Sequence, residues 1–443
     1  MRTSRIVAIG AVGIAAALAL SACSSAGNTG GDTGGENNNG QIGKVDGSGR
    51  TLTVWAMTGD LSDATLAAIN KEFESETGAK VKVETQQWQD IATKITTALA
   101  TDTPPDVVDI GNTQVSTFAS SGGLADLTSY KDALAQGQTW LDGLANPATI
   151  DGKLYGVPSF GATRTVIYNK TMWAAAGVTA APTTYDELKA ALDKVKAKNT
   201  ASDFSSFYLP GQYWYAGMQW IWDAGGDIAA QQDGTWVAGF SDAKAQQGLT
   251  DWKSFQNTYS SKASQTLNTD KPDQDQVFAD GKSSAIIGNN WEIGAIEKAN
   301  PKITDADLGT FAMPGVSGST QPVMLAGSVW GIAQKSKNQD LARVWTKIAA
   351  GPDIQNTNVV KDGWIPNSVE GSKKAVDGGT LTDLQKAFFQ AAQNSKATPP
   401  SGNWAQLEDP GMKQFFQTVA SGTKSPADAA KAWDDTVNST LNQ

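Results

Sequence analysis

The sequence predicts an α/β fold built as two lobes, and two observations support this. Strand-like and helix-like segments alternate from residue 51 to residue 110, and a β-α-β-α-β order implies a parallel sheet with helices on its faces. The part of the chain expected to fold, residues 51–443, is also too long for a single compact core. We therefore expect the chain to divide into two lobes.

Apolar spacing predicts the elements of the first part of the chain. Short apolar runs at 51–55, 81–84 and 106–110 predict strands, and apolar side chains at helical spacing predict helices over 60–77 and 90–100. The carboxyl ends of parallel strands meet at one edge of a sheet, and ligands bind there in folds of this class. The loops that follow the three strands are therefore the first candidates for a binding site.

The rest of the chain continues the mixed pattern. A strand is predicted at 165–169, and the capping box formed by Thr184 and Glu187 opens a helix that runs to Val195. The segment 207–227 is rich in tryptophan and tyrosine, and its helix is predicted to begin after a Pro-Gly pair. Further on, the patterns predict a buried strand within 276–294, a strand within 325–333 and mostly helical structure from residue 380.

The composition excludes several classes of function. The chain has no histidine, which rules out Ser-His-Asp and Cys-His nucleophile systems and histidine-based zinc sites. Its single cysteine, Cys23, cannot form an internal disulfide. The formal charge of −10 argues against nucleic acid as a partner. We predict no catalytic residue, no metal site and no cofactor.

The excess of tryptophan points to the chemistry of the ligand. The chain has 15 Trp against 13 Phe and 8 Tyr, although core packing alone usually prefers Phe and Leu. An indole is large and rigid, and its flat face suits the C–H face of a sugar ring. Most of the tryptophans are expected to be structural. Those expected in the core are Trp55, Trp220, Trp222 and Trp345.

The N-terminus predicts export and attachment to a lipid. Two arginines precede fifteen apolar residues at 6–20, a run that is short for a membrane span and typical of a secretory signal. The following Leu-Ser-Ala-Cys resembles the lipobox of bacterial lipoproteins, which implies cleavage of a signal peptide, 1–22, and acylation of Cys23. The polar composition of 23–50 predicts a flexible tether. The alternative is an ordinary signal peptide with a chance cysteine.

Three stretches carry a resemblance to a known family. They are PPDVVDIGNTQVSTFASSGGL at 104–124, YGVPSFGATRTVIYNKTMWAAAGV at 155–178 and FADGKSSAIIGNNWEIG at 278–294. In this order and behind a lipobox, they resemble the extracellular solute-binding proteins (family 1) of ABC sugar importers, the group that includes maltose-binding protein. The resemblance extends over essentially all of residues 51–443.

The resemblance implies a type II periplasmic-binding-protein fold, in which the ligand occupies a cleft between two lobes joined by hinge crossings. Lobe 1 is expected to comprise 51–158 and 326–375, and lobe 2 is expected to comprise 159–325 and 376–443. Hinges are expected near 157–162, 324–328 and 375–382.

The same resemblance implies a binding protein and not an enzyme. We expect a monomer, held by its lipid on the extracytoplasmic face of a bacterial cell membrane. Its cleft would close on a mono- or oligosaccharide, because the ligand touches both lobes only when the cleft is shut. The membrane subunits of an ABC permease would then receive the sugar.

The resemblance also carries ligand-binding residues over by position. They follow the first three strands, lie past the first crossing, or sit in aromatic-rich turns. The positions are Met57, Thr58, Gln87, Trp88, Asn112, Gln114, Arg164, Tyr213, Trp214, Asn290, Trp291, Glu292, Trp364 and Trp404.

Departures from the family pattern leave the ligand open. Ala162 replaces an acid that contacts the ligand in the maltodextrin binder, and Ile110 replaces an aromatic residue, so maltose specificity does not follow. One alternative is a binder of another solute, such as a polyol, a glycerophosphodiester or a peptide. Another is a secreted glycoside hydrolase with two carboxylates flanking the scissile bond. A surface adhesin would usually show repeats, and none is visible.

Overall fold

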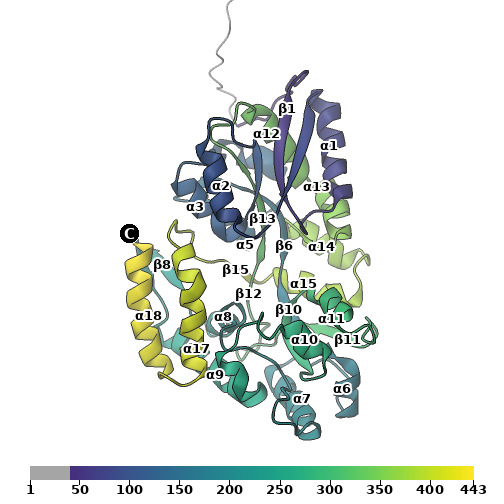
Figure 1. Cartoon of the computed structure of the whole chain (residues 1–443), viewed down its shortest axis with the longest axis vertical. Coiled ribbons are helices and arrows are strands. Elements are labelled where there is room, and N and C mark those ends of the chain that lie inside the picture. The colour runs from purple at the N-terminus through teal and green to yellow at the C-terminus, as the bar shows by residue number, and fades with distance from the viewer. Residues whose placement is uncertain (1–39) are drawn as a thin grey trace, which may run out of the picture. The chain divides into compact units, whose positions relative to one another are not determined.

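The computed structural model describes residues 40–443. Within this range the chain forms two lobes, each around its own sheet, which lie one above the other in Figure 1. The predicted signal peptide, Cys23 and the first part of the predicted tether lie outside the described residues. No helix within 40–443 is long and apolar enough to cross a membrane.

The first lobe is built on a six-stranded sheet of order β14-β6-β13-β3-β1-β2. Strand β1 (Thr51–Met57) pairs in parallel with β2 (Lys80–Gln86) and with β3 (Val107–Gly111), as the alternation of strands and helices predicts. Three antiparallel strands complete the sheet: β13 (Ala326–Ile332), β6 (Val157–Ala162) and β14 (Ile365–Pro366). The carboxyl ends of β1, β2 and β3 therefore meet at one edge of the sheet.

Helix α1 (Asp63–Thr77) shows how the sequence sets the boundaries of the elements. The Ser62 hydroxyl accepts a hydrogen bond from the Thr65 backbone N–H, and Gly78 ends the helix in the left-handed conformation that suits glycine. The helix begins three residues after the predicted start, which leaves residues 58–62 as a loop. The other elements of this lobe are α2 (Ile91–Ala100), α3 (Val115–Ser120), α4 (Lys131–Ala135), α5 (Asp142–Ala145), β4 (Thr149–Ile150), β5 (Lys153–Leu154), α12 (Gln339–Ala350), α13 (Pro352–Ile354) and α14 (Val369–Asp377).

The second lobe surrounds a three-stranded antiparallel sheet of order β10-β7-β11, made of β10 (Ala285–Asn289), β7 (Arg164–Asn169) and β11 (Leu308–Phe311). The predicted capping box, with Thr184 and Glu187, opens α7 and is confirmed. The helices and hairpin of this lobe are α6 (Lys170–Ala175), α7 (Tyr185–Lys198), α8 (Trp214–Asp223), β8 (Ala229–Gln232), β9 (Thr235–Ala238), α9 (Ala243–Tyr259), α10 (Gln274–Ala279), α11 (Glu292–Ala299), α15 (Asp383–Ala392), α16 (Ala405–Leu407), α17 (Lys413–Ala420) and α18 (Pro426–Leu441).

The chain passes from one lobe to the other at points where a strand of one lobe is followed directly by a strand of the other. Strand β6 is followed by β7 after Thr163 alone, and β12 (Val323–Met324) is followed by β13 after Leu325 alone. The first passage therefore lies beyond the boundary expected between 158 and 159, because β6 stays in the first sheet as far as Ala162. A third passage leads from α14 to α15. A hydrophobic cluster at these passages packs side chains of both lobes together, among them Leu144, Ile167, Leu325, Ile365 and Phe388.

Residues 41–50 differ from the expected flexible tether, because they dock on the first lobe. The Gly47 N–H donates to Thr77 O at 2.7 Å, and the Lys80 N–H donates to Arg50 O at 2.9 Å. Ile42 and Val45 pack against the core of this lobe. The composition of the segment is polar enough to suggest a coil, but these two apolar side chains hold it in place.

Arg50 fastens the end of this docked segment. Its guanidinium donates to both carboxylate oxygens of Asp340, at 2.8 and 2.7 Å, and twice to the Asn338 side-chain oxygen, at 3.2 and 3.0 Å. A two-pronged arginine–carboxylate pair of this kind is stronger than a surface ion pair.

We expect Arg50→Ala to lower the free energy of unfolding by about 1–2 kcal/mol, since partly buried hydrogen bonds to charged groups are lost. Urea denaturation of soluble protein from which residues 1–39 are removed measures the change. Lys80→Ala is the matched control: Lys80 pairs with Glu74 but is largely exposed, so its loss should cost under about 0.5 kcal/mol. Equal effects of the two substitutions would contradict the structural role of Arg50.

Candidate ligand-binding site

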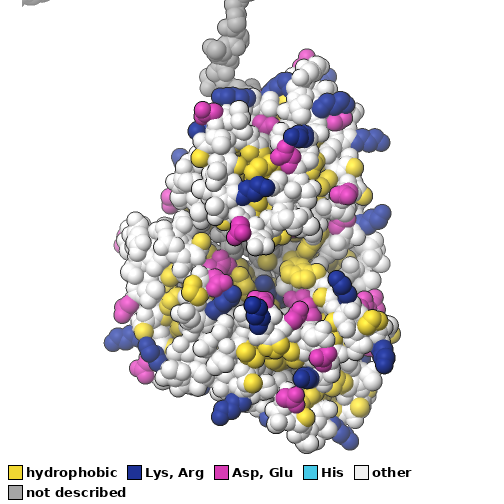
Figure 2. Space-filling view, viewed as in Figure 1, with side chains coloured by type: hydrophobic (Ala, Val, Ile, Leu, Met, Phe, Trp, Pro, Cys, Tyr) yellow, Lys and Arg dark blue, Asp and Glu magenta, His cyan; other side chains and the backbone are white. Residues whose placement is uncertain are grey.

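A cavity of about 490 Å³ opens between the two lobes, which is a size typical of small-molecule sites. Figure 2 shows the surface hollowed there, with hydrophobic, acidic and basic side chains around the opening. The lining comes from loops and helices of the two lobes and from the strands that pass between them. It consists of Thr58, Gly59, Asp60, Trp88, Gly111, Asn112, Thr113, Gln114, Phe160, Ala162, Arg164, Tyr215, Trp291, Met324, Ala326, Gly327, Ser328, Trp364 and Glu408.

The floor of the cavity is made by the passing strands themselves. Phe160 and Ala162 belong to β6, whereas Ala326 and Gly327 belong to the antiparallel neighbour β13. A side chain at Gly327 would bring its Cβ within 2.1 Å of Phe160 O, so only glycine allows the two strands to approach this closely. The side chains that these strands present at the floor are apolar.

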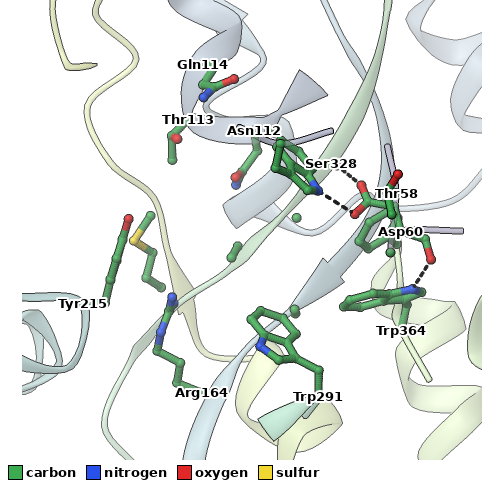
Figure 3. Close-up of a pocket in the computed structure, with 18 of the residues that line it drawn as sticks. Thr58, Asp60, Asn112, Thr113, Gln114, Arg164, Tyr215, Trp291, Ser328 and Trp364 are labelled. Atoms are coloured by element: carbon green, nitrogen blue, oxygen red, sulfur yellow. Dashed lines mark hydrogen bonds between the residues drawn. The ribbon is translucent and has the colours of Figure 1, made fainter. Parts of the chain in front are cut away.

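Asp60 organises the wall of the first lobe. Its carboxylate accepts hydrogen bonds from the Ser328 hydroxyl at 2.9 Å and from the Trp88 indole N–H at 3.3 Å. Its backbone oxygen accepts from the Trp364 indole N–H at 3.0 Å. Figure 3 shows the last of these bonds, with Asp60, Ser328 and Trp364 grouped on one side of the cavity. One residue therefore orients two indoles at the site.

A second buried carboxyl, Asp109 of β3, lies behind Asp60. One of its oxygens accepts from the Met57 backbone N–H at 3.3 Å, and the other is buried without a donor in the described chain. Burial raises the pKa of Asp60 to about 6, and burial together with the charge of Asp60 raises the pKa of Asp109 well above its usual range. Both carboxyls are therefore easier to protonate than a carboxyl in water.

Indole faces remain exposed at the opening. Trp88 of the first lobe is 40% exposed and Trp291 of the second lobe is 49% exposed, although tryptophan is usually well buried. Trp291 lies 5.9 Å from Trp364 between ring centroids, and Trp364 packs 4.7 Å from Phe160. Aromatic faces from both lobes thus border the cavity.

Arg164 and Glu408 line the wall of the second lobe. The Arg164 Nε–H donates to the Tyr213 hydroxyl at 3.0 Å, and its guanidinium lies 4.3 Å over the ring of Tyr215. The Tyr215 hydroxyl in turn donates to Glu408 Oε1 at 3.0 Å. Burial raises the pKa of Glu408 above its ordinary value. In Figure 3, Arg164 and Tyr215 point into the cavity from the side opposite Asp60. Within residues 40–443, no group of three or more acidic, cysteine or histidine side chains could hold a metal ion.

Half of the residues predicted from the sequence line this cavity. Those at the lining are Thr58, Trp88, Asn112, Gln114, Arg164, Trp291 and Trp364. Asn112 also has a structural task, because its side-chain amide donates to Gly143 O and to Leu325 O, both at 2.9 Å.

Three of the other predicted residues support the lining from behind. The Gln87 amide donates to Thr58 Oγ1 at 2.9 Å, and the Asn290 amide donates to Gly363 O at 2.9 Å, beside Trp364. Tyr213 holds Arg164.

The remaining four predicted residues are corrected by the structure. Met57 is buried in the core of the first lobe. Glu292 is buried and accepts from the Asn289 N–H at 3.0 Å. Trp214 and Trp404, 1% and 0% exposed, pack against each other in the core of the second lobe. Indoles beside turn residues serve as core here, and nothing in the sequence separates them from Trp291.

Sequence reasoning missed several lining residues. Tyr215 follows Trp214 on α8, and adjacent residues on a helix face directions about 100° apart, so choosing the neighbour exchanges a cavity residue for a core residue. Asp60 lies in the loop after β1, which the sequence already marks as a candidate region. A polar side chain just beyond a parallel strand is the signal that could have identified it. Glu408 and Ser328 carry no local signal.

The chain is similar to proteins of a known family. A model of bacterial extracellular solute-binding proteins matches residues 68–377. The chain is 36% identical over 446 residues to the diacetylchitobiose binding protein DasA of Streptomyces coelicolor, covering 100% of both chains. Among solved structures, it is similar to the sugar-binding protein MalE of Xanthomonas citri, with a TM-score of 0.75, 22% identity and coverage of 88% of this chain and 97% of that one.

A further solved structure is the GacH receptor of Streptomyces glaucescens, determined without ligand and with acarbose. It has a TM-score of 0.69 and 24% identity, and the match covers 88% of this chain and 98% of that one. These structures have the predicted two-lobe binding-protein fold, which is thereby confirmed.

The carboxyl pair predicts how stability depends on pH. With folded pKa values above the ordinary 3.8, the folded state binds more protons than the unfolded state between about pH 4 and 6, so the contribution of the pair to stability is lost as pH rises through that window. Asp109→Asn removes one acid and supplies a donor. We expect it to raise the free energy of unfolding at pH 7.5 by about 1–3 kcal/mol, with little gain at pH 4.

Thermal and urea unfolding from pH 4 to 8 measure this difference. Asp102→Asn is the control, because that side chain is almost fully exposed. If the stability curves of Asp109→Asn and the unsubstituted protein run parallel across the window, the pKa of Asp109 is not raised in the folded state.

Proposed function

The chain belongs to the family of bacterial extracellular solute-binding proteins, and from this premise we propose that it captures an oligosaccharide outside the cell and delivers it to the permease of an ABC importer. The resemblance found in the sequence is thus confirmed. The observation that carries the choice of ligand is the pair of exposed indoles, Trp88 and Trp291, at a cavity lined from both lobes. Flat apolar faces beside polar side chains suit a hydroxyl-rich, neutral ring.

Closure follows from the position of the cavity. Trp88 and Asn112 come from one lobe, and Trp291 and Arg164 come from the other, so a ligand gains contacts with both when the lobes approach. A ligand that binds the closed form better shifts the population toward it. The permease subunits would recognise the closed arrangement, and no chemical step is needed.

The lobe boundaries and the anchor belong to the same proposal. We take the lobes to move as units about the three passages, with the first pivot at Thr163. The extracellular family places the protein outside the cytoplasm, and the lipobox supports a lipid on Cys23 that keeps it at the membrane.

The variant Cys23→Ser should then be released into the medium, because it lacks the acylated side chain. Recovery of this variant in the membrane fraction would rule out the anchor.

A binding protein returns its ligand unchanged, in contrast to a glycoside hydrolase. The relatives named above are binding proteins. A hydrolase also needs two carboxyls flanking one bond, with one of them free to act on it. Asp60 is instead engaged with Ser328 and Trp88, and Glu408 is engaged with Tyr215.

The relative's ligand suggests which sugars to test first. DasA is named for diacetylchitobiose, so this disaccharide belongs in the panel beside cellobiose, maltose and maltotetraose. Calorimetric titration of residues 40–443, with chromatography of the recovered sugar, should give saturable micromolar binding and intact sugar. Cleaved sugar would establish the hydrolase, and binding of a glycerophosphodiester or peptide instead would establish the other alternative.

We expect Trp291→Ala to weaken the binding of the best sugar about 10- to 100-fold, because one stacked ring face is lost. Trp236→Ala is the matched control: Trp236 lies on β9, outside the lining of this cavity. Melting temperatures of both variants verify that they fold. Unchanged affinity in Trp291→Ala would show that the exposed indole does not contact the ligand.

A further inference from the structure

Trp291 borders the cavity from a short turn of the second lobe. With Asn290 it forms the whole connection between β10 and α11, and it is 49% exposed (Figure 3). Trp88 and Trp364 are fixed by hydrogen bonds from their indole N–H groups, whereas Trp291 has the ring of Trp364, from the first lobe, beside it. The direction of the Trp291 indole therefore depends on how the second lobe holds the turn at 289–292.

Glu292 folds back onto this turn with its carboxylate buried. Its Oε1 accepts hydrogen bonds from the backbone N–H and from the side-chain amide of Asn289, both at 3.0 Å. Its Oε2 accepts from the side-chain amide of Gln274 at 2.5 Å. A Cβ at Gly288 would lie 2.6 Å from this oxygen, so the carboxylate fills the space that a larger residue there would need. Glu292 itself is only 6% exposed.

The charge at this place lies mainly on Glu292. Burial and the neighbouring charge of Glu292 raise the pKa of Asp275 to about 8, so Asp275 gives up its proton after Glu292 does. Burial also raises the pKa of Glu292, but the hydrogen bonds from Asn289 and Gln274 counteract this effect. Hydrogen bonds to an ionised carboxylate are about twice as strong as those between neutral groups. The turn is thus closed by strong bonds.

All of these bonds stay within the second lobe. Asn289 ends β10 and Gln274 begins α10, which both belong to it. The other polar contact of the turn crosses to the first lobe, where the Asn290 amide donates to Gly363 O at 2.9 Å. That contact depends on the distance between the lobes, and the bonds of Glu292 do not. Glu292 therefore holds the turn in any arrangement of the lobes.

We propose that Glu292 is a positioning residue for Trp291, which holds the turn so that the indole faces the cavity before a sugar arrives. Glu292 does not contact the sugar. It lowers the cost of binding, because a side chain that already points the right way does not have to be ordered by the ligand. The effect on affinity rests on the proposed function, whereas the fixing of the indole can be measured without any sugar.

Fluorine NMR tests the position of the indole directly. Soluble protein of residues 40–443 labelled with fluorotryptophan gives one signal for each of its 15 tryptophans, and Trp291→Phe identifies the signal of Trp291. We expect Glu292→Ala to shift and broaden this signal, because the indole is no longer held in one direction. An unchanged Trp291 signal in Glu292→Ala overturns the proposal, whether or not a sugar is found to bind.

Two milder variants separate positioning from loss of the fold. Glu292→Gln still accepts from Asn289, and Gln274 can turn its amide toward it, because its side-chain oxygen has no donor within the described chain. This variant should keep the Trp291 signal in place. Asn289→Ala removes one bond and keeps the backbone bond, so it serves if Glu292→Ala does not fold. It should shift the same signal and weaken sugar binding about threefold.

A double-mutant cycle tests whether Glu292 acts through Trp291. The probe is the sugar of the panel above that binds most tightly, titrated by calorimetry. Glu292→Ala should weaken its binding about tenfold when Trp291 is present and less than about twofold in the Trp291→Ala background. A tenfold loss in both backgrounds would mean that Glu292 acts independently of the indole, and would overturn the proposal.

Asp434→Ala is the matched control. Asp434 is another acid of the second lobe that holds a turn, because it accepts from the backbone N–H groups of Phe240 and Ser241 at 3.0 and 2.8 Å, and it does not line the cavity. Its loss should lower the melting temperature and leave both the Trp291 signal and the affinity unchanged. If it weakens sugar binding as much as Glu292→Ala does, general loss of stability explains both effects, and the proposal is wrong.

Discussion

The strands that join the two lobes are also the floor of the cavity, and much of the molecule is arranged around this constraint. The side-chain amide of Asn112 donates to the backbone oxygens of Gly143 and Leu325, so the end of β3 is tied to α5 and to the second passage. Gly327 lets β13 lie close against β6 at the same place. A relative motion of the lobes would therefore pivot at the floor of the cavity. In the proposed function, this geometry would couple ligand contact to closure of the lobes without a relay between distant sites.

The sequence predicts those parts of the site that depend on regular structure. Alternating strands and helices place the loops after β1, β2 and β3 at one edge, and Thr58, Trp88, Asn112 and Gln114 all follow from that rule. The two-lobe division follows from chain length and is seen in two separate cores. The spacing of apolar residues and the order of strands and helices can be read from short stretches of sequence, so they can be recognised without a structure.

The parts that could not be predicted depend on direction and on distant contacts. Trp214 and Tyr215 differ by one position on α8, and the packing of the second lobe alone decides which of them faces the cavity. Asp60 and Ser328 are far apart in the chain and meet only through the fold. The docking of residues 41–50 depends on two apolar side chains, and the polar composition of the segment as a whole does not reveal them. Each of these depends on tertiary packing, which a one-dimensional pattern does not contain.

Several wall residues of the cavity come from separate loops, and this affects how the binding site can change during evolution. Thr58, Trp88 and Trp291 each belong to a different loop, and each can change without altering the strands of the floor. Duplicated copies of this scaffold can therefore acquire new cargoes by exchanging wall residues one loop at a time, while the glycine and asparagine at the crossing keep the pivot intact. Asn112 and Gly327 both line the cavity and hold the crossing together, so the freedom to change is confined to the loop residues of the walls.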